Sequence, residues 1–281
     1  MMEALGLGDT EFRQISSLVY STFGINLTEQ KRVLVAGRLT KRVRQLGLAS
    51  FGDYVKVMME DSSGKELSEM INRITTNHSF FFRENDHFEF LQQTVLPEIQ
   101  SKISRDRTYP FRMWSAGCAA GEEVYTLAIV LREYFGDALE GIDLGILASD
   151  ISLTVLNAAE KGIYPANRLQ EVPPKLLSTY FRQIDSENFE IAERLRKRVM
   201  FKKLNLIAPS FPFKGKFDFV FCRNVMIYFD EPTRKQLVET LFRYVKPGGY
   251  LFIGHSESLR RETCPFRYIK PAIYQKDIAD A

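Results

Sequence analysis

Along the first quarter of the chain, hydrophobic residues recur with the three- and four-residue spacing of amphipathic helices. The apolar positions of the first stretch share one helical face: Phe12, Ile15, Leu18 and Val19. Asp9 or Thr10 can cap the amino end of this helix. Three further helices are expected, over residues 27–46, 51–59 and 67–74. Because nothing here alternates as a strand does, the pattern predicts an all-helical domain over residues 1–75.

From residue 111 onwards, short apolar runs typical of buried strands alternate with helical patterns. The expected strands are 111–116, 144–150, 217–222 and 249–254. This alternation predicts a parallel α/β sheet in a second domain over residues 76–281, with 266–270 and 272–276 adding antiparallel edge strands. A hairpin over 180–192 and a third strand at 199–202 predict a small antiparallel β insertion at about 180–203.

Polar residues follow the predicted strands at their carboxyl ends, where open α/β sheets bind ligands. The strand 217–222 runs into Arg223 and Asn224, and the strand 144–150 ends at Asp150. A Gly-x-x-x-Gly turn at 117–121 follows the first strand and opens a helix that begins with Glu122 and Glu123. Since the ends of neighbouring parallel strands meet at one edge of the sheet, these residues are expected to share a pocket.

The chemistry of this pocket favours an adenosine ligand without phosphates. The turn is neither the Gly-x-Gly-x-x-Gly of dinucleotide-binding proteins nor a P-loop. Glu122 and Glu123 would repel a pyrophosphate, although acidic residues also simply complement a helix dipole. Asp150 can accept hydrogen bonds from ribose hydroxyls, or it can cap the helix that follows. S-adenosylmethionine fits, because it has a ribose, an adenine, an amino-acid tail and a sulfonium cation.

Composition narrows the class of protein further. The chain has 281 residues, 45% of them hydrophobic and 26% charged, and its net charge of +3 gives no global argument for nucleic acid. The three cysteines suggest neither a disulfide framework nor a zinc cluster. His78 and His87 have no ligand companions in the sequence and are expected at the surface or at an interface, so no metal is predicted. We see no signal peptide or membrane span and expect a cytoplasmic protein.

Three consecutive phenylalanines, 80–82, lie where the helical part ends, and we expect them to be buried between the two domains. Arg83 follows them and can pair with Glu84 or Asp86 at the surface. The run His255-Ser256-Glu257 is not a catalytic triad, because three consecutive residues cannot converge in that geometry.

Four motifs in this order resemble the chemotaxis receptor methyltransferases of the CheR family. They are Thr-Thr-Asn-x-Ser-x-Phe-Phe-Arg-Glu at 75–84, Trp-Ser-Ala-Gly-Cys-x-x-Gly-Glu-Glu at 114–123, Ala-Ser-Asp at 148–150 and Cys-Arg-Asn-Val-Met-Ile-Tyr-Phe at 222–229. The resemblance covers nearly the whole chain. It implies a helical domain followed by a Rossmann-like class I methyltransferase domain. It also implies transfer of a methyl group from S-adenosylmethionine to glutamate side chains of a chemoreceptor's cytoplasmic coiled coil, leaving S-adenosylhomocysteine.

By position, the resemblance also implies the site residues. The implied cofactor contacts are Asn77, Ser79, Arg83, Glu123, Asp150, Asn205, Leu206, Arg223 and Asn224. Arg83 and Tyr228 match the two residues proposed to help the reaction. The hairpin turn at 183–188 has no glycine, whereas family members that dock a receptor's C-terminal pentapeptide carry glycines there, so this docking is not expected.

A basic run in the second predicted helix suggests how an acidic substrate is attracted. Arg38, Lys41 and Arg42 neighbour each other at helical spacing, and we expect them to bind the substrate, although such a run is often only a solvated face. A nucleic-acid role is disfavoured because aromatic residues are not interleaved with the basic ones. Two alternatives stay open: a cofactor-sensing adaptor derived from a methyltransferase, and a carboxyl methyltransferase acting on a non-receptor protein. We expect a monomer.

Overall fold

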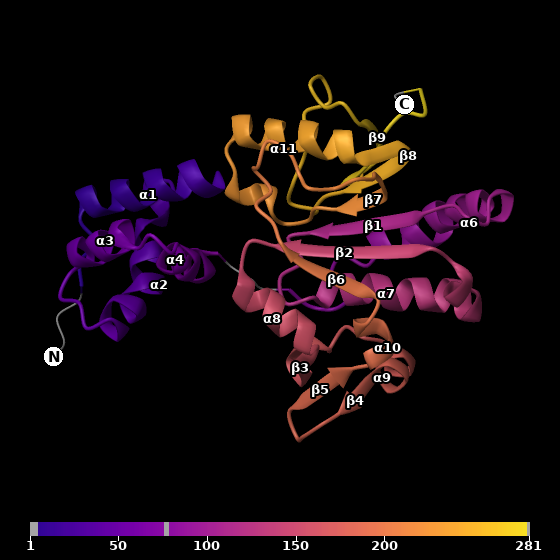
Figure 1. Cartoon of the computed structure of the whole chain (residues 1–281), viewed down its shortest axis with the longest axis horizontal. Coiled ribbons are helices and arrows are strands. Elements are labelled where there is room, and N and C mark those ends of the chain that lie inside the picture. Colours follow the sequence, from indigo (N-terminus) through magenta and orange to yellow (C-terminus); the bar gives the residue numbers. More distant parts are fainter. Residues whose placement is uncertain (1–4, 76–78, 280–281) are drawn as a thin grey trace. The chain divides into compact units, whose positions relative to one another are not determined.

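The structure is a computed structural model that describes residues 5–75 and 79–279, and the chain divides into two compact units (Figure 1). One unit contains the N-terminal helices together with a later segment, Tyr228–Thr233. The other contains Asn77–Ile227 and Arg234–Ala281. Among the described residues, no helix is both long and apolar enough to span a membrane.

The helical unit contains the expected helices. Their bounds are α1 (Asp9–Phe23), α2 (Arg32–Gln45, preceded by the 3-10 turn η1, Glu29–Lys31), α3 (Phe51–Glu60) and α4 (Lys65–Ile74). Their apolar faces meet in one core that includes Phe12, Ile15, Val19, Val35, Leu39, Val43, Tyr54 and Met70. The predicted cap of the first helix is wrong: Gly8 occupies that position, and Asp9 lies in the first turn, where its carboxylate pairs with Arg32. A carboxylate in the first turn still complements the helix dipole.

The segment Tyr228–Thr233 packs with these helices although it follows them by about 150 residues. The backbone N–H of Asn26 donates to the carbonyl oxygen of Tyr228 at 2.8 Å, and Ile25 forms an antiparallel bridge with Phe229. The hydroxyl of Tyr20 donates to Asp230 Oδ2 at 2.8 Å. Tyr228 is therefore held by the helical unit.

The second unit is built on a seven-stranded sheet in the order β6-β2-β1-β7-β8-β10-β9 (Figure 1). The parallel strands are β1 (Phe111–Ala116), β2 (Leu144–Asp150), β6 (Val199–Lys203), β7 (Phe217–Phe221) and β8 (Val245–Phe252). The antiparallel edge is formed by β9 (Arg267–Lys270) and β10 (Ile273–Gln275), as the sequence predicted. Every residue of β7 is buried, which explains its unbroken apolar pattern in the sequence. The Rossmann-like fold class is confirmed.

The remaining helical elements of the chain lie before β1 or in the connections between the strands, and two of them, η5 and α11, include residues of Tyr228–Thr233. They are α5 (Asp86–Phe90), η2 (Leu91–Val95), α6 (Leu96–Arg105), α7 (Glu122–Phe135), η3 (Gly136–Gly141), α8 (Leu153–Lys161), η4 (Ala166–Arg168), α9 (Pro174–Tyr180), α10 (Glu193–Arg196), η5 (Met226–Tyr228) and α11 (Glu231–Tyr244). Of these, α7 is buried almost all round, because it packs directly on the sheet and carries few outward-facing positions.

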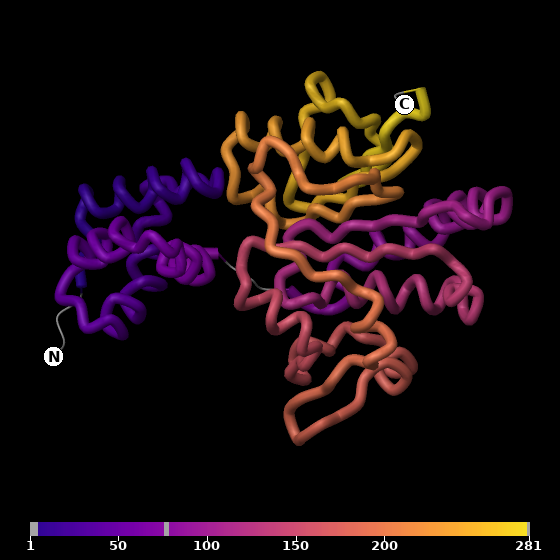
Figure 2. The backbone as a smooth tube through the Cα atoms, in the orientation of Figure 1, coloured from indigo at the N-terminus to yellow at the C-terminus, as the bar shows by residue number. Residues whose placement is uncertain are grey.

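The β insertion is smaller and differently built than the sequence predicted. The hairpin is confirmed as β4 (Phe181–Gln183) and β5 (Asn188–Ile191), and Figure 2 traces it as a long loop beyond the rest of the unit. Its third strand is β3 (Ile163–Pro165), which is too short to show a period in the sequence. The strand predicted at 199–202 is confirmed as β6, but its assignment to the insertion is wrong, because β6 pairs in parallel with β2 in the main sheet.

The three phenylalanines do not all behave as predicted. Phe81 is fully buried, and its ring packs edge-on against Tyr164 and Phe181, with centroids 4.9 and 5.1 Å away. All three residues belong to the second unit, so Phe81 completes the core of that unit instead of filling an interface between domains. Phe80 and Phe82 are partly exposed.

Candidate functional site

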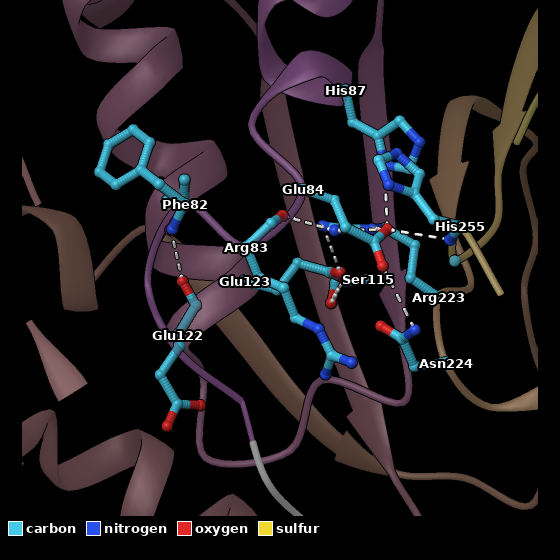
Figure 3. Close-up of polar contacts among 12 residues, drawn as sticks. Phe82, Arg83, Glu84, His87, Ser115, Glu122, Glu123, Arg223, Asn224 and His255 are labelled. Atoms are coloured by element: carbon cyan, nitrogen blue, oxygen red, sulfur yellow. Dashed lines mark hydrogen bonds and ion pairs between the residues drawn. The ribbon is translucent and has the colours of Figure 1, made fainter. Parts of the chain in front are cut away.

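The sheet order brings the predicted site residues to one edge. Strand β1 lies between β2 and β7, and Ser115 near its carboxyl end is in register with Ala148 on one side and Phe221 on the other. The glycine turn, Asp150 and the Arg223-Asn224 pair therefore follow three adjacent strands, as expected. Figure 3 shows part of this edge, where Glu84, Glu123, Arg223 and Asn224 converge.

Asp150 faces the glycine turn. Its Oδ2 accepts the backbone N–H of Ala119 at 3.0 Å, and its Oδ1 accepts that of Ser152 at 2.9 Å. The cap of α8 is Ser152, whose hydroxyl oxygen accepts the N–H of Val155, so the helix-cap interpretation of Asp150 is wrong. Burial raises the pKa of Asp150, and backbone N–H groups offset only part of that rise. A half-buried carboxylate at this strand end suits two ribose hydroxyls.

The turn itself depends on its glycines. Gly117 has a φ of +86°, and a Cβ added there would lie 2.4 Å from Val225 Cγ2 in the loop after β7. Gly121 has a φ of +93°, and its Cβ would lie 2.9 Å from the methyl group of Ala159. Both positions combine a conformation that favours glycine with a neighbour that leaves no room for a side chain. The turn is thereby fixed against the Arg223-Asn224 loop.

Arg223 is the centre of a buried ion-pair cluster (Figure 3). Only 5% of its surface is exposed. Its Nη2 lies 2.9 Å from Glu84 Oε2 and also donates to the carbonyl of Arg83, and its Nη1 lies 3.3 Å from Glu123 Oε2. The other oxygen of Glu123 accepts the hydroxyl of Ser115 at 2.7 Å.

The two carboxylates beside Arg223 respond to it differently. For Glu84, burial acts to raise the pKa, but the Arg223 guanidinium outweighs it and the net pKa is lowered. For Glu123, burial dominates and the net pKa is raised despite the same cation. Glu84 is therefore the carboxylate that most firmly balances the charge of Arg223.

Asn224 lies in a left-handed conformation, with a φ of +59°. Its Nδ2 approaches Glu84 Oε1 at 3.4 Å, and its backbone N–H donates to Glu257 Oε2 at 2.9 Å. The Glu257 carboxylate also accepts the N–H groups of Gly254 and Ile227. Glu257 thus organises backbone, which agrees with the rejection of a triad at 255–257.

The other implied cofactor contacts lie at the same edge or outside the described residues. Asn205 and Leu206 follow β6, and the preceding Leu204 N–H donates to the carbonyl of Asp150 at 3.0 Å. The carbonyl of Ser79 accepts a hydrogen bond from Arg168. The Arg83 guanidinium lies 5.9 Å from the centroid of the Phe80 ring. Asn77 lies outside the described residues.

In the helical unit, the three predicted substrate-binding residues differ from one another. Lys41 is exposed, whereas Arg38 is partly buried and donates to the carbonyl of Ile74. Arg42 makes a two-pronged pair with the buried Glu66, at 2.5 Å from Nη2 to Oε2 and 3.0 Å from Nε to Oε1. This ion pair gives Arg42 a structural role in the unit, and its role in substrate binding stays a prediction.

His87 is the residue whose burial differs most from the prediction. We expected it at the surface or at an interface, but it is fully buried, and its ring centroid lies 4.8 Å from that of His255. Glu84, His87 and His255 form a cluster whose donor atoms lie within 4.8 Å of one another. Positions 84–87 and 255 are brought together only by the fold, so no local spacing could reveal the cluster.

The fold and the site together define the class of protein. The parallel strands have a glycine turn after the first and an acidic residue at the end of the second, and a helical unit precedes them in the chain. This is the architecture of a Rossmann-like methyltransferase. The comparisons with known proteins agree. Residues 10–75 match the family model described as CheR methyltransferase, all-alpha domain, and residues 77–274 match CheR methyltransferase, SAM binding domain. The chain belongs to the CheR family.

Relatives cover nearly the whole chain. A chemotaxis protein methyltransferase of Borreliella burgdorferi is 43% identical over 95% of this chain and 94% of its own length. Those of Klebsiella aerogenes and Escherichia coli are 37% and 38% identical, over 98% and 92% of this chain and 92% and 87% of theirs. The predicted family, enzyme class and cofactor are confirmed: the chain is a chemotaxis methyltransferase that uses S-adenosylmethionine. Glu122 and Glu123 after the glycine turn, together with the Asp150 carboxylate, are acidic hydrogen-bond acceptors, and they fit this phosphate-free cofactor.

Proposed function

We propose that this protein methylates glutamate side chains on the cytoplasmic coiled coil of a chemoreceptor, forming γ-carboxyl methyl esters. The observation that carries the proposal is the match of both domains, helical and cofactor-binding, to one family of chemotaxis methyltransferases. The cofactor, when bound, supplies an electrophilic methyl group on a sulfonium.

A cluster at the sheet edge is proposed to hold the cofactor. Asp150 accepts the ribose hydroxyls, and Asn205 and Leu206 lie at the next strand end, where they contact the adenine. The residues proposed for the rest of the cofactor are Asn77, Ser79, Arg83, Glu123, Arg223 and Asn224. This division follows from the strand order, because β2 and β6 are neighbours on one side of β1 and β7 is its neighbour on the other.

The reaction asks little acid–base chemistry of the protein. A glutamate carboxylate has an ordinary pKa of about 4.3 and is already ionised at neutral pH, so no general base is required. What the enzyme must supply is alignment, with the nucleophilic oxygen about 3 Å from the methyl carbon. We assign Arg83 to hold a carboxylate and Tyr228 to orient the nucleophile by hydrogen bonding.

The exposed face of α2 is proposed to meet the receptor. Lys41 and Arg38 provide positive charge that attracts a glutamate-rich helix. Val33 and Leu34 are exposed large apolar residues on the same helix, and Gly37 lies between them and Lys41 with open space around it. A bare glycine on an exposed helix face lets a partner helix approach closely. We propose a monomeric enzyme that acts without nucleic acid.

The hairpin is not proposed to dock a receptor pentapeptide. Its turn is closed by Asp185, whose Oδ1 accepts the N–H groups of Glu187 and Asn188, both at 2.8 Å. The Asp185 side chain therefore closes the turn by hydrogen bonds to the backbone, as Asx turns do.

The test is an alkali-release assay. The protein is incubated with methyl-labelled S-adenosylmethionine and membranes carrying a cognate chemoreceptor, and the product is treated with alkali. Carboxyl methyl esters release labelled methanol, whereas methylated lysine, arginine or nucleic acid do not. Label on the receptor that resists alkali overturns carboxyl transfer. Cofactor binding without transfer to any protein favours the adaptor, and alkali-labile label on another protein favours a non-receptor substrate.

A further inference from the structure

We propose that Glu84 is a positioning residue of the cofactor site, holding Arg223 and Asn224 in the orientation that the cofactor requires. This inference rests on the proposed cofactor roles of those two residues. Glu84 Oε2 accepts Arg223 Nη2 at 2.9 Å and Nε at 3.3 Å, and Oε1 accepts Asn224 Nδ2 at 3.4 Å. The Glu84 carboxylate thus accepts hydrogen bonds from both polar residues that follow β7 (Figure 3).

Glu84 also joins segments that are distant in the sequence. The backbone N–H of His255, after β8, donates to Glu84 Oε2 at 3.2 Å, and Arg223 reaches back to the carbonyl of Arg83. Three loops therefore contact one carboxylate: the loop 81–85, the loop after β7 and the loop after β8. Because Arg83 is the neighbour of Glu84, the same contacts fix the backbone that carries Arg83.

The backbone around Glu84 is held in a conformation that side chains disfavour. Phe82 and Glu84 have φ values of +58° and +55°, and Asn224 opposite them has +59°. Non-glycine residues persist there only when their surroundings over-determine the conformation, and such residues gather at functional sites. The ion pair with Arg223 is one of the contacts that surround this backbone.

The electrostatic arrangement explains why Glu84 cannot be replaced by Glu123. Both carboxylates face Arg223, but only the pKa of Glu84 is lowered, so its charge is the one that the guanidinium stabilises. Arg223 also lies over the rings of Phe88 and Phe221, at 5.6 and 5.8 Å from their centroids, where water cannot screen it. Removing the charge of Glu84 leaves a buried cation short of a partner, which then shifts towards Glu123.

A divalent cation is the competing explanation for the cluster of Glu84, His87 and His255. Both ring nitrogens of His87 are buried without a hydrogen-bond partner, as a vacant ligand would be. However, Glu84 Oε2 already accepts Arg223 twice and His255 once, and the guanidinium would repel a cation at this place. Burial lowers the pKa of His87 to about 3, so this ring packs neutral against Phe252. The geometry therefore favours a clamp, by which we mean the Glu84 carboxylate holding Arg223 and Asn224, over a metal site.

The test measures the dissociation constant for S-adenosylmethionine in Glu84→Gln by calorimetry on the full chain. Loss of a charged hydrogen bond predicts a rise of about tenfold to a hundredfold. Glu84→Asp keeps the charge on a shorter side chain and should give a smaller rise, and it serves in place of Glu84→Gln if that variant does not fold. In combination with Arg223→Lys, the effects should fall well short of additive, because Glu84 acts through Arg223.

The matched control is Asp218→Asn, at the opposite end of β7. Asp218 is a buried carboxylate paired with Lys246 at 2.8 Å, so its loss also removes a buried ion pair from the same strand. It should lower the melting temperature but leave the dissociation constant within about twofold of wild type. Unchanged cofactor binding in Glu84→Gln, an equal rise in Asp218→Asn, or additivity with Arg223→Lys overturns the proposal.

Two further measurements distinguish this proposal from a metal site and from the proposed receptor methylation. If a chelator weakens cofactor binding by wild type and Zn²⁺ restores it, the cluster is a metal site and the clamp is wrong; binding unaffected by the chelator supports the clamp. The calorimetric measurement contains no receptor, so its result on Glu84 is valid even if the receptor-methylation assay fails. Wild type that binds the cofactor but esterifies no glutamate contradicts the proposed function and leaves the role of Glu84 to be decided by the variants.

Discussion

Arg42 and Glu66 form a two-pronged ion pair inside the helical unit, and the hydroxyl of Tyr54 donates to the same carboxylate at 2.9 Å. Glu66 is buried, and Arg42 is its counter-charge. The pair joins α2 to α4. It distinguishes Arg42 from Lys41, its exposed neighbour on the basic run.

Arg42→Ala should destabilise the protein strongly, because it leaves a buried carboxylate without its counter-charge. The expected loss is on the order of 3 kcal/mol in the free energy of unfolding. Chemical denaturation followed by circular dichroism measures it. Arg44→Ala, at an exposed position of the same helix, should cost less than about 0.5 kcal/mol. Equal losses in both variants would contradict the structural role of the pair.

Lys41→Glu should weaken receptor methylation without unfolding the helical unit. An exposed cation near an acidic substrate acts mainly on encounter, so the KM for receptor should rise about threefold to tenfold at low salt and the salt dependence should flatten. Initial rates of methylation at several salt concentrations provide the measurement. Lys65→Glu makes the same change of charge at another exposed site of the unit and should have a smaller effect. Identical behaviour of the two variants would mean that the α2 face is only a solvated surface.

Asp150→Ala should weaken binding of S-adenosylmethionine about tenfold to a hundredfold, through lost ribose hydrogen bonds. The natural control is Ser152→Ala, because Ser152 is the residue that caps α8. Its loss should cost about 1 kcal/mol of stability with little change in affinity. Calorimetric titration of both variants gives the comparison. If Asp150→Ala bound normally, the carboxylate would serve only the glycine turn.

Cofactor affinity should fall in acid at a pH above the ordinary range of an aspartate. Burial raises the pKa of Asp150 above 3.8, so protonation, which removes the acceptor charge, begins at a higher pH. The same shift means that the folded protein binds this proton more readily than the unfolded chain. The contribution of Asp150 to stability therefore increases as the pH falls, and the loss of affinity is not unfolding. The affinity for S-adenosylmethionine is measured as a function of pH. In Asp150→Asn, which has no carboxylate to protonate, the decrease of affinity in acid that is due to Asp150 should be absent.

Tyr228→Phe should lower kcat about fivefold to tenfold while leaving cofactor affinity unchanged, because it removes one hydrogen bond and keeps the ring. Single-turnover methylation of receptor separates the chemical step from binding. Tyr20→Phe is the control, since it removes the bond to Asp230 two residues away. A similar fall of kcat in Tyr20→Phe would show that the segment's position matters more than the Tyr228 hydroxyl.

Most of the fold was predictable from the sequence because its elements are periodic. The four N-terminal helices and strands β1, β2 and β7 have apolar patterns that follow from burial. The third strand of the insertion was not predictable, because β3 has only three residues and β6 alternates as an edge strand of either sheet would. Local patterns report which face is buried but not which sheet buries it.

The site was predictable where its residues end strands, and not where it depends on distant partners. That Arg223, Asn224 and Asp150 lie at one edge of the sheet was predictable, because the ends of neighbouring parallel strands meet there. Glu84 resembled a surface partner of Arg83, and nothing in the sequence near it indicates Arg223 at a separation of 139 residues. Side-chain pairs of this kind become visible only after the chain has folded.

The position of Tyr228–Thr233 has a consequence for synthesis on the ribosome. The helices of the first unit emerge early, but the segment that pairs with Ile25 and Asn26 follows about 150 residues later. At about 5–20 residues per second, the nascent helical unit waits roughly 8 to 30 s for it. A truncated chain ending before Tyr228 would keep the Ile25 edge unpaired. The helical unit, although it is translated first, can therefore be completed only after most of the second unit has been synthesised.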